Sequence, residues 1–414
     1  MKDLKVIFMG TPVFCVPILE ELINKYNVIM VVSQPDKEKD RKGNIIYSPC
    51  KEIGIKNNIE VYQPIKIREE YQYILDKRPD IIITAAYGQI IPSQILDYPK
   101  YGCINVHGSL LPKLRGGAPI HHAIINGDKE AGVTIMYMDK KMDSGDIISQ
   151  RSINIDDNMI LDDLYYKLSI LGRDLLIDTL PSILNGTNNR IKQNEEEVTY
   201  GLNITKEEEL INFNDSVSNV HNKIRGLSSI PGAYAMLNNK RMKIYLSEKT
   251  NNISKEKPGT ITDINKNGIT VSTKDYDIIL KNIKLEGKNR CDVKDFINGI
   301  KKENFIGGYF MNLITEDVEK LFLQNPLYSH ENEGFDAQVL VKFFNPCGAG
   351  TWLITEARKE DDDWLLFGYM HIFEWEWGYV LLSELQSIRL PYGLTICMEA
   401  NLHMTVKQLL NGGF

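Results

Sequence analysis

The sequence predicts a mostly parallel α/β sheet, followed by an antiparallel β-barrel and a small α+β domain. In the first 150 residues, short apolar runs alternate with helix-length amphipathic segments. From about residue 230, short strands are separated by polar turns, and the composition changes again after residue 310. A chain of 414 residues is long enough for two or three domains. We therefore expect an α/β domain over 1–190, a linker over 191–208, a barrel over 209–310 and an appended domain over 311–414.

Apolar runs of strand length define the core of the first domain. They occur at 4–10, 27–34, 80–88, 102–108 and 132–139, and the segment 16–26 has helical spacing. Strand–helix alternation predicts helices on both faces of the sheet, and ligands of such sheets bind beyond the carboxyl ends of the strands. The turn after the first run reads GTPVFCVP and not G-x-G-x-x-G, which does not favour a dinucleotide site.

The later segments differ in pattern and in charge. A strongly periodic helix is predicted over 161–186, and N-G and K-N-G turns beyond residue 230 indicate a small antiparallel barrel. Residues 311–414 contain 15 acidic and 6 basic residues and all four tryptophans, whereas residues 1–310 contain 40 acidic and 42 basic residues. Such a contrast indicates at least two separately evolved units. We expect the junction at residue 310 to be a fusion of two whole proteins.

The spacing of the cysteines and the length of the apolar runs indicate the compartment of the protein and the kinds of site it lacks. The six cysteines are scattered singly without a C-x-x-C pair, which predicts a reducing, cytoplasmic setting and no cysteine zinc site. No clustered pattern of metal ligands occurs, so we expect no metal. No apolar stretch approaches a membrane span, and the N-terminal MKDLKVIFMGTP lacks the core of a signal peptide.

An asparagine and a histidine follow each other at a spacing of two in GCINVHGSLLPKLRGGAPI (102–120). Alternate side chains of a strand share a face, so Asn105 and His107 are expected on one side of a strand end. An amide N–H and an imidazole there can stabilise an oxyanion and handle a proton during attack on a carbonyl. Asp143, in MDSGDII, is the candidate carboxylate partner of the imidazole. The spacing alone leaves a purely structural role open.

Together with its neighbours, this segment resembles the folate-dependent formyltransferases, and specifically those that act on methionyl-tRNA. The resemblance covers residues 1–310 and implies a Rossmann-like formyltransferase fold, an OB-like barrel that binds tRNA, and a monomer. The stretches that carry it stand in the family order and read FMGTPVFCVPIL, VVSQPDK, YSPCKEIG, AAYGQIIP, GCINVHGSLLPKLRGGAPIHHAIINGD, GVTIMYMD and MDSGDII.

The resemblance also implies a reaction for translation initiation. A formyl group would pass from 10-formyltetrahydrofolate to the amino group of methionine on initiator Met-tRNA, without a metal. Asn105 and His107 would stabilise the oxyanion, while Asp143 would orient and polarise His107 and help to take the amine proton. The loop 138–143 would surround the pterin. The other folate-binding residues would be Ser109, Leu110, Leu111, Pro112, Tyr87, Gly88 and Ile91, although one of the two leucines could be ordinary core.

Basic residues are the candidates for tRNA contacts. In this family an insertion corresponding to the polar loop 36–54 contacts the acceptor stem, and Arg41 or Lys42 matches its key basic position. Lys39 lies beside them, and Arg241 in the barrel is a candidate phosphate contact. Arg115 is open between a contact with substrate phosphate or ribose and a role in holding a loop. His121 and His122 are assigned no function.

Two other functions stay open. One is a formyltransferase for a small amine, an amino-sugar nucleotide or glycinamide ribonucleotide, which would not need the loop 36–54 or the barrel. The other is a non-catalytic tRNA- or folate-binding protein. The presence of all three of Asn105, His107 and Asp143 argues against this alternative. Residues 311–414 resemble a small domain family of unknown function from phage and mobile elements, through KFFNPCGAGTWLITE and FGYMHIFEWEWGYVLLSEL. The negative charge of this domain would permit a nucleic-acid mimic or a module that binds basic partners.

Overall fold

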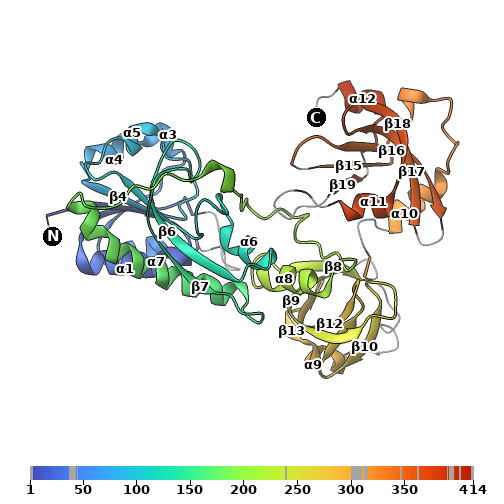
Figure 1. The fold of residues 1–414 in the computed structure, drawn as a ribbon, viewed down its shortest axis with the longest axis horizontal. Coiled ribbons are helices and arrows are strands. Elements are labelled where there is room, and N and C mark those ends of the chain that lie inside the picture. The colour runs from blue at the N-terminus through green and yellow to red at the C-terminus, as the bar shows by residue number, and fades with distance from the viewer. Residues whose placement is uncertain are drawn as a thin grey trace. The chain divides into compact units, whose positions relative to one another are not determined.

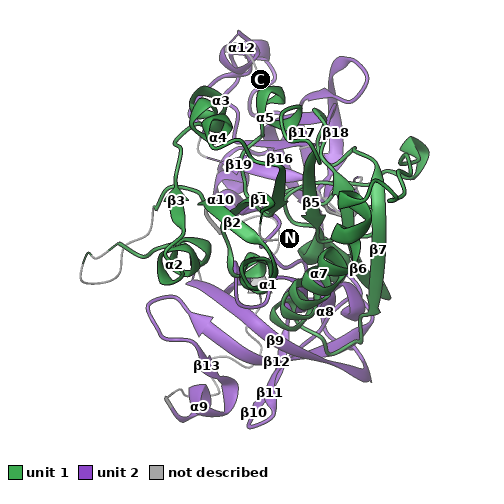
Figure 2. Ribbon diagram, turned by 90° about the vertical axis from the view of Figure 1, so that its left-hand side faces the viewer, with its two compact units in different colours: residues 1–204 green, residues 205–414 purple. Residues whose placement is uncertain are grey.

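The computed structural model describes residues 3–36, 43, 45–237, 240–299, 310–311, 316–345, 347–360, 363–388, 390, 396–400 and 402–411. The chain divides into two compact units, residues 1–204 and residues 205–414 (Figure 2). The first unit contains one sheet, and the second contains two separate antiparallel sheets in its described part. No helix in the described ranges is both long and apolar enough to cross a bilayer.

The sheet of the first unit has seven strands in the order β3-β2-β1-β4-β5-β6-β7. Strands β1 to β5 are parallel, whereas β6 and β7 run antiparallel to their neighbours. This confirms the mostly parallel sheet predicted from the apolar runs. The strands are β1 (Lys5–Gly10), β2 (Asn27–Val32), β3 (Glu60–Tyr62), β4 (Ile81–Ala85), β5 (Cys103–His107), β6 (Glu130–Tyr137) and β7 (Ile147–Asn154).

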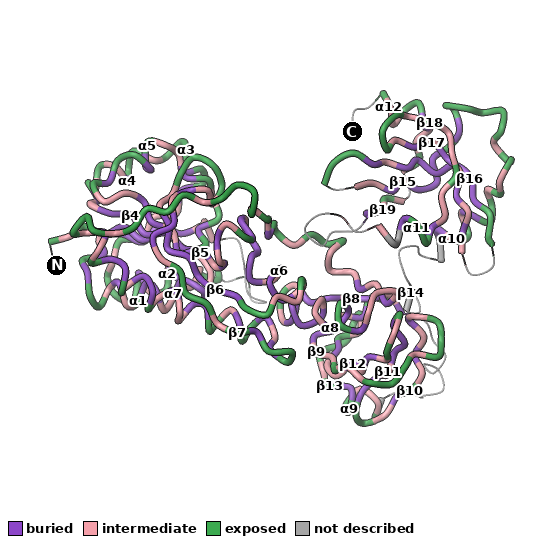
Figure 3. The backbone as a smooth tube through the Cα atoms, viewed as in Figure 1, coloured by how far each residue is buried: buried purple, intermediate pink, exposed green. Residues whose placement is uncertain are grey.

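Helices cover both faces of this sheet (Figure 1). On one face lie α1 (Val16–Lys25) and α7 (Leu161–Leu184), and on the other lie α3 (Ile67–Glu70), α4 (Gln72–Asp76) and α5 (Ser93–Leu96). The remaining helical elements of the unit are η1 (Val13–Cys15), α2 (Pro49–Lys56), α6 (Pro119–Ile125) and η2 (Glu195–Glu197). The residues of the central strands are mostly buried, and exposed residues gather on the outer helices and loops (Figure 3).

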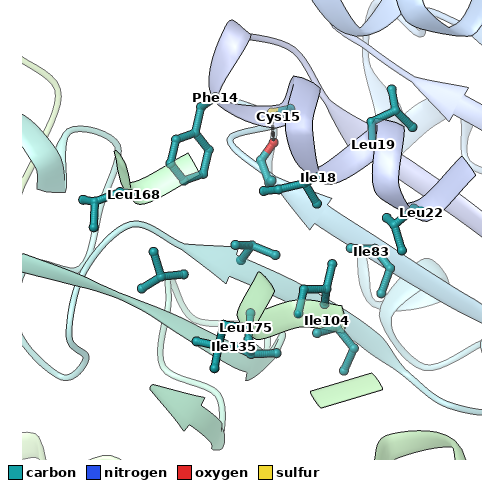
Figure 4. Packing of buried hydrophobic residues seen from close by; sticks show 14 of the residues in the cluster. Phe14, Cys15, Ile18, Leu19, Leu22, Ile83, Ile104, Ile135, Leu168 and Leu175 are labelled. Carbon is teal, nitrogen blue, oxygen red and sulfur yellow. Dashed lines mark hydrogen bonds between the residues drawn. The ribbon is translucent and has the colours of Figure 1, made fainter. Parts of the chain in front are cut away.

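The core between the sheet and α1 fixes the strand ends near which the site lies. Ile18 and Leu22 of α1 are fully buried in one cluster with Ile83 of β4 (Figure 4). Burying a side chain of this size contributes about 1.5–3 kcal/mol. The Cys15 thiol donates to the carbonyl oxygen of Ala85 at 2.9 Å (Figure 4), so the start of α1 is bonded to the carboxyl end of β4.

Helix α7 supports β5 directly. Its buried positions recur with helical spacing, and Gly172 lies where the helix meets the strand. A Cβ added to Gly172 would lie 2.9 Å from Cγ1 of Val106, so only glycine permits this close approach. Val106 separates Asn105 from His107 in the sequence, and the helix therefore packs against the strand that carries both residues.

The first part of the second unit is an antiparallel sheet with the path β10-β11-β12-β9-β8-β14, in which β13 also pairs with β12. Register shifts along the pairing of β9 with β12 mark bulges, which bend and twist long strands. Its elements are α8 (Val217–Gly226), β8 (Ala233–Leu237), β9 (Lys240–Ile253), β10 (Ile261–Asn265), β11 (Gly268–Val271), β12 (Tyr276–Leu285), β13 (Cys291–Asp292), α9 (Val293–Phe296), η3 (Ile297–Gly299) and β14 (Phe310–Met311).

The second part is a five-stranded antiparallel sheet, β18-β17-β16-β15-β19, with helices, which confirms the predicted α+β class. Buried aromatic residues, among them Phe322, Phe343 and Trp364, form its main core. Its elements are α10 (Glu316–Gln324), η5 (Gly334–Asp336), β15 (Val341–Phe344), β16 (Thr351–Glu360), β17 (Asp363–His371), β18 (Trp375–Leu381), α11 (Leu382–Ser387), β19 (Cys397–Ala400) and α12 (Val406–Asn411).

Candidate active site

Asn105, His107 and Asp143 line one cavity of about 640 Å³ in the first unit. Asn105 and His107 lie at the carboxyl end of β5, and Asp143 lies in the loop between β6 and β7. The structure therefore brings together the three residues that were predicted to act on a carbonyl. The cavity is also lined by residues that follow β4, by residues 116–121 and by residues 138–142.

The amide of Asn105 is oriented by a neighbouring strand. Thr84 of β4 pairs with Asn105 in the sheet register, and its hydroxyl donates to Oδ1 of Asn105 at 2.8 Å. Since Oδ1 accepts this bond, the Nδ2 amino group is the part of the side chain that can donate to a ligand. Thr84 is buried and also lines the cavity, so the donor is held by a rigid element.

His107 is buried, with 5% of the residue's surface exposed, and polar groups lie near both nitrogens of its ring. Nε2 lies 3.1 Å from the carbonyl oxygen of Leu114, and Nδ1 lies 3.8 Å from Oδ2 of Asp143. A carbonyl oxygen can only accept, so Nε2 donates to it and the neutral ring carries its lone pair on Nδ1. The distance to Asp143 is that of a charge contact and not of a hydrogen bond. The sequence did not indicate Leu114, because a main-chain oxygen has no residue signature.

Asp143 is held by its own backbone and by the loop opposite. Its φ of +48° lies in the left-handed region, and Oδ2 accepts the backbone N–H of Gly116 at 2.9 Å. The Gln193 amide donates to the carbonyl oxygens of Asp143 at 2.7 Å and of Gly145 at 2.9 Å. A Cβ added to Gly145 would lie 1.8 Å from the carbonyl oxygen of Tyr137, so the loop requires glycine there. The carboxylate position is thus strongly determined.

Arg115, which the sequence left open between a substrate contact and a structural role, holds a loop. Its guanidinium is buried and donates to Oε1 of Gln193 at 2.9 and 3.0 Å and to both carboxylate oxygens of Glu195. The hydrogen bond from Arg115 holds the pKa of Glu195 below its ordinary value. These contacts bond the loop after β5 to residues that were predicted to be linker.

Residues 199–203 also lie against the site. Thr199 accepts the backbone N–H of Leu114 at 2.9 Å through its hydroxyl. Gly201 donates its backbone N–H to the carbonyl oxygen of Arg115 and accepts the N–H of Ala118. Asn203 lines the cavity. A Cβ added to Gly117 would lie 2.1 Å from the side-chain oxygen of Asn203. Nothing in the polar pattern of this segment indicated that it forms part of the cavity wall.

The residues predicted to bind folate divide into two groups. Tyr87, Gly88 and Ile91 line the cavity, as does the loop 138–143. Ser109, Leu110, Leu111 and Pro112 are not among the lining residues. The latter turn is bonded to β6, because Thr134 donates to the carbonyl of Ser109 at 2.6 Å and accepts the N–H of Leu111 at 3.1 Å. Leu111 packs in a small core with residues of β6 and β7.

Tyr87 follows a strained turn at the end of β4. Ala86 has a φ of +42° and is exposed, while the Tyr87 ring is buried. Burial raises the pKa of the Tyr87 phenol. Its hydroxyl has no hydrogen-bond partner among the described residues. Non-glycine residues with a positive φ are costly and cluster at functional sites. Ala86 and Asp143 have a positive φ and line this cavity, and Leu114, also with a positive φ, contacts the lining residue His107.

The predicted tRNA contacts fall in different places. Lys39, Arg41 and Lys42 lie outside the described residues. Arg241 lies on β9 in the second unit and is exposed. Its guanidinium lies 4.2 Å from the centre of the Tyr234 ring, a distance typical of a cation–π contact.

Comparison with known proteins identifies the chain's relatives. Family models match residues 4–180 (formyl transferase), residues 203–301 (formyl transferase, C-terminal domain) and residues 313–410 (protein of unknown function, DUF2958). The methionyl-tRNA formyltransferase of Malacoplasma penetrans (strain HF-2) is 45% identical over 299 residues, which cover 72% of this chain and 94% of that protein. The one from Staphylococcus aureus (strain MW2) is 46% identical over 300 residues, 71% of this chain and 96% of that protein. The chain belongs to the methionyl-tRNA formyltransferase family.

Solved structures show the same fold. The sugar 3N-formyltransferase WlaRD, solved in the presence of dTDP and 5-N-formyl-THF, matches 69% of this chain and 99% of its own with a TM-score of 0.52 and 24% identity. The N-formyltransferase of Helicobacter canadensis, in complex with folinic acid and dTDP-3-aminofucose, has a TM-score of 0.51. At this identity the likeness concerns the fold alone. The methionyl-tRNA formyltransferase resemblance and the presence of an additional domain after it, both predicted from the sequence, are confirmed.

Proposed function

We propose that the chain transfers the formyl group of 10-formyltetrahydrofolate to the α-amino group of methionine on initiator Met-tRNA. The observation that carries this proposal is the convergence of Asn105, His107 and Asp143 on one cavity. Relatives that bear the name methionyl-tRNA formyltransferase are 44–46% identical to this chain. We further propose that the enzyme acts as a cytoplasmic monomer.

The cavity fits a folate. Its volume of about 640 Å³ lies within the roughly 300–1,000 Å³ typical of small-molecule sites. Tyr87, Ile91 and Met138 give it apolar walls, and the exposed backbone at Gly88 supplies polar groups at the edge of the same wall. Apolar walls with a few polar groups suit a flat heterocycle. We assign the donor to this wall and propose that Ser109, Leu110, Leu111 and Pro112, which follow the lining residue Gly108, contact it as well.

The bound donor supplies an activated formyl carbon, and the residues of the chain handle charge and protons around it. The Nδ2 group of Asn105 donates a hydrogen bond to the formyl oxygen, where negative charge develops as the amine attacks. Nδ1 of His107 takes a proton from the attacking amine, because Nε2–H is already bonded to Leu114. The carboxylate of Asp143, 3.8 Å away, stabilises the imidazolium that forms. The tetrahedral intermediate then collapses with cleavage of the bond between the formyl carbon and N10 of the folate, and the imidazolium returns the proton to N10, which leaves as tetrahydrofolate.

We assign the binding of the acceptor tRNA to the barrel region and to the polar loop 36–54. We propose that residues 209–310 bind tRNA and that Arg41, Lys42 and Lys39 contact the acceptor stem. Arg241 is exposed on β9 and is available for a phosphate contact. Such contacts release counterions, so tRNA binding should weaken as the salt concentration rises.

A formylation assay with two acceptors tests the proposal. The purified chain is supplied with 10-formyltetrahydrofolate and either charged initiator Met-tRNA or a dTDP-linked amino sugar. We expect formyl-methionyl-tRNA and no formylated sugar. Formylation of the sugar alone would overturn the acceptor assignment, and formylation of neither would overturn the enzymatic function. Arg41→Ala combined with Lys42→Ala should raise KM for the tRNA without changing KM for the donor.

A further inference from the structure

A series of polar contacts lies behind the wall of the cavity that Tyr87, Gly88 and Gln89 form. It starts at Gln34, just beyond the end of β2, whose side-chain amide donates to the carbonyl oxygen of Tyr87 at 3.1 Å. The hydroxyl of Thr11 donates to the same oxygen at 3.2 Å and accepts the backbone N–H of Gln34 at 3.2 Å. Residues that follow β1 and β2 are thus bonded to one main-chain oxygen that follows β4.

Gln34 also contacts the two residues after Tyr87. Its Oε1 accepts a hydrogen bond from Nε2 of Gln89 at 3.4 Å. A Cβ added to Gly88 would lie 3.4 Å from Nε2 of Gln34, so the backbone of Gly88 lies in contact with this carboxamide. A displacement of the Gln34 side chain would therefore move the cavity wall.

A shielded ion pair fixes Gln34 from the other side. Nε2 of Gln63 donates to the carbonyl oxygen of Gln34 at 2.7 Å and to Oδ1 of Asp36 at 3.0 Å. Nζ of Lys51 donates to Oε1 of Gln63 at 2.8 Å and also to Oδ2 of Asp36. The side chains of Lys51 and Asp36 are 16% and 11% exposed. A pair shielded to this degree interacts more strongly than one on the surface.

Lys51 is itself restrained along its length. Its ammonium lies 4.0 Å from the centre of the Tyr47 ring. Its backbone N–H donates to the hydroxyl of Ser48, the N-cap of α2, at 3.3 Å. That hydroxyl lies 2.5 Å from the hydroxyl of Ser33, next to Gln34. The charge of Lys51 is therefore held at a defined place relative to the strand ends.

We propose that Lys51, acting through Asp36, Gln63 and Gln34, is a positioning residue for the donor-binding wall of the cavity. The inference rests on the proposed function for the identity of the donor. These four residues do not belong to the cavity lining. Their effect reaches a ligand only through the backbone of Tyr87, Gly88 and Gln89, which do belong to it. Small displacements of positioning groups cost about tenfold to a hundredfold in affinity or rate.

Binding of folinic acid to the full chain is the direct test, measured by calorimetry well below the unfolding temperature. Lys51→Met keeps the length of the side chain and removes its charge, and we expect Kd to rise about tenfold. Lys51→Arg keeps the charge and should stay within about threefold of the parent chain. Lys25→Met removes a more exposed ion pair, Nζ to Oε1 of Glu21 at 3.1 Å, and should leave Kd unchanged.

Steady-state kinetics separate positioning from simple stabilisation. Lys51→Met should raise KM for the donor and leave KM for Met-tRNA unchanged. The loss of donor binding free energy in the double variant, Asp36→Asn combined with Lys51→Met, should be smaller than the sum of the losses in the two single variants, because the residues are in contact. Gln34→Ala should weaken the binding of folinic acid to a similar extent. It serves as the second variant if Lys51→Met does not fold.

Two outcomes distinguish failure of this inference from failure of the proposed function. If Lys51→Met and Gln34→Ala bind folinic acid as tightly as the parent chain while their melting temperatures fall, the contacts only stabilise the fold and the inference is wrong. If both variants bind folinic acid more weakly but the parent chain does not formylate Met-tRNA, the positioning role stands and the proposed acceptor is wrong.

Discussion

The carbonyl oxygen of Leu114 lies 3.1 Å from Nε2 of His107. This oxygen can only accept a hydrogen bond, so it selects the ring tautomer that carries the proton on Nε2. Leu114 holds this position with a φ of +58°, and its own N–H is bonded to Thr199. A strained loop residue therefore turns the proton-accepting edge of the imidazole toward Asp143, where the carboxylate can stabilise a positive charge.

Replacing Asp143 by asparagine separates its charge from its shape. The asparagine oxygen can still accept the N–H of Gly116, so we expect the loop and the melting temperature to be preserved. The imidazolium of His107 would lose its carboxylate neighbour, and kcat should fall about a hundredfold or more. Asp146→Asn is the matched control, because Asp146 lies in the same loop and pairs with Arg190. Unchanged kcat in Asp143→Asn would contradict the proton-transfer role.

The oxyanion contact is tested at Asn105 and at its orienting partner. Asn105→Ala removes the Nδ2 donor, and kcat should fall about 10²–10³-fold. Thr84→Val keeps the donor but removes the bond to Oδ1, so the fall should be smaller, about tenfold. Single-turnover measurements with saturating Met-tRNA isolate this step from binding. Equal losses in the two variants would show that Thr84 acts in some other way than by orienting the amide.

Arg115 provides a prediction about stability. Arg115→Met leaves Gln193 and Glu195 without their buried partner, and the free energy of unfolding should fall by about 2 kcal/mol. Glu195→Gln should have little effect, because the Glu195 side chain is mostly exposed and surface ion pairs contribute little. Urea unfolding at pH 7 measures both. A stable Arg115→Met chain with a raised KM for tRNA would instead support the substrate contact that the sequence left open.

The ionisation of Asp36 makes the stability of the protein depend on pH. Burial alone would raise the pKa of its carboxyl group, but hydrogen bonds from Lys51 and Gln63 outweigh it and hold the pKa below its ordinary value. The ionised group therefore stabilises the fold above the ordinary carboxyl pKa, and this contribution is lost as the pH falls through the lowered folded-state pKa. The stability difference between the parent chain and Asp36→Asn should be largest near neutral pH and shrink toward strong acid. A constant difference from pH 7 down to pH 3, measured by urea unfolding, would contradict the assigned cause.

The strands that contain a long apolar run could be predicted from the sequence, and the strands that lack one were missed. Strands β1, β2, β4, β5 and β6 are apolar runs, and each was placed to within a few residues. Strand β7 reads IISQRSIN and β3 has only three residues, so neither contains a long apolar run, and both were missed. Their positions depend on pairing with β6 and β2, which is a property of the whole sheet.

The same distinction holds in the site. Asn105, His107 and Asp143 were predicted because each is a side chain with the chemistry that the proposed reaction needs, at a strand end or in a loop after a strand, and the structure places all three around one cavity. Leu114 acts through its backbone, and Asn203 belongs to a polar segment without periodicity, so neither could be recognised from residue type. The turn at 109–112 was assigned to ligand contact, which stays a prediction, and its bonds to Thr134 of β6 and Gln150 of β7 could not be read from the sequence.

Removal of the additional domain tests its independence. Relatives without this segment match 94–96% of their own length, and the last sheet has a core of its own. A chain that ends after Met311 keeps β14, whose two residues pair with Leu237 and Met236 of β8. We expect this chain to formylate Met-tRNA with kcat/KM within about twofold of the full chain, as for an independent domain.

A chain that ends after Gly299 is the informative comparison, because it lacks β14 and leaves β8 paired with β9 on one side only, as an edge strand. Its melting temperature should be lower than that of the chain ending at Met311, and it should aggregate more readily. If the longer of the two truncated chains binds folinic acid normally but has lost formylation, residues 312–414 take part in the reaction and are not an independent appendage.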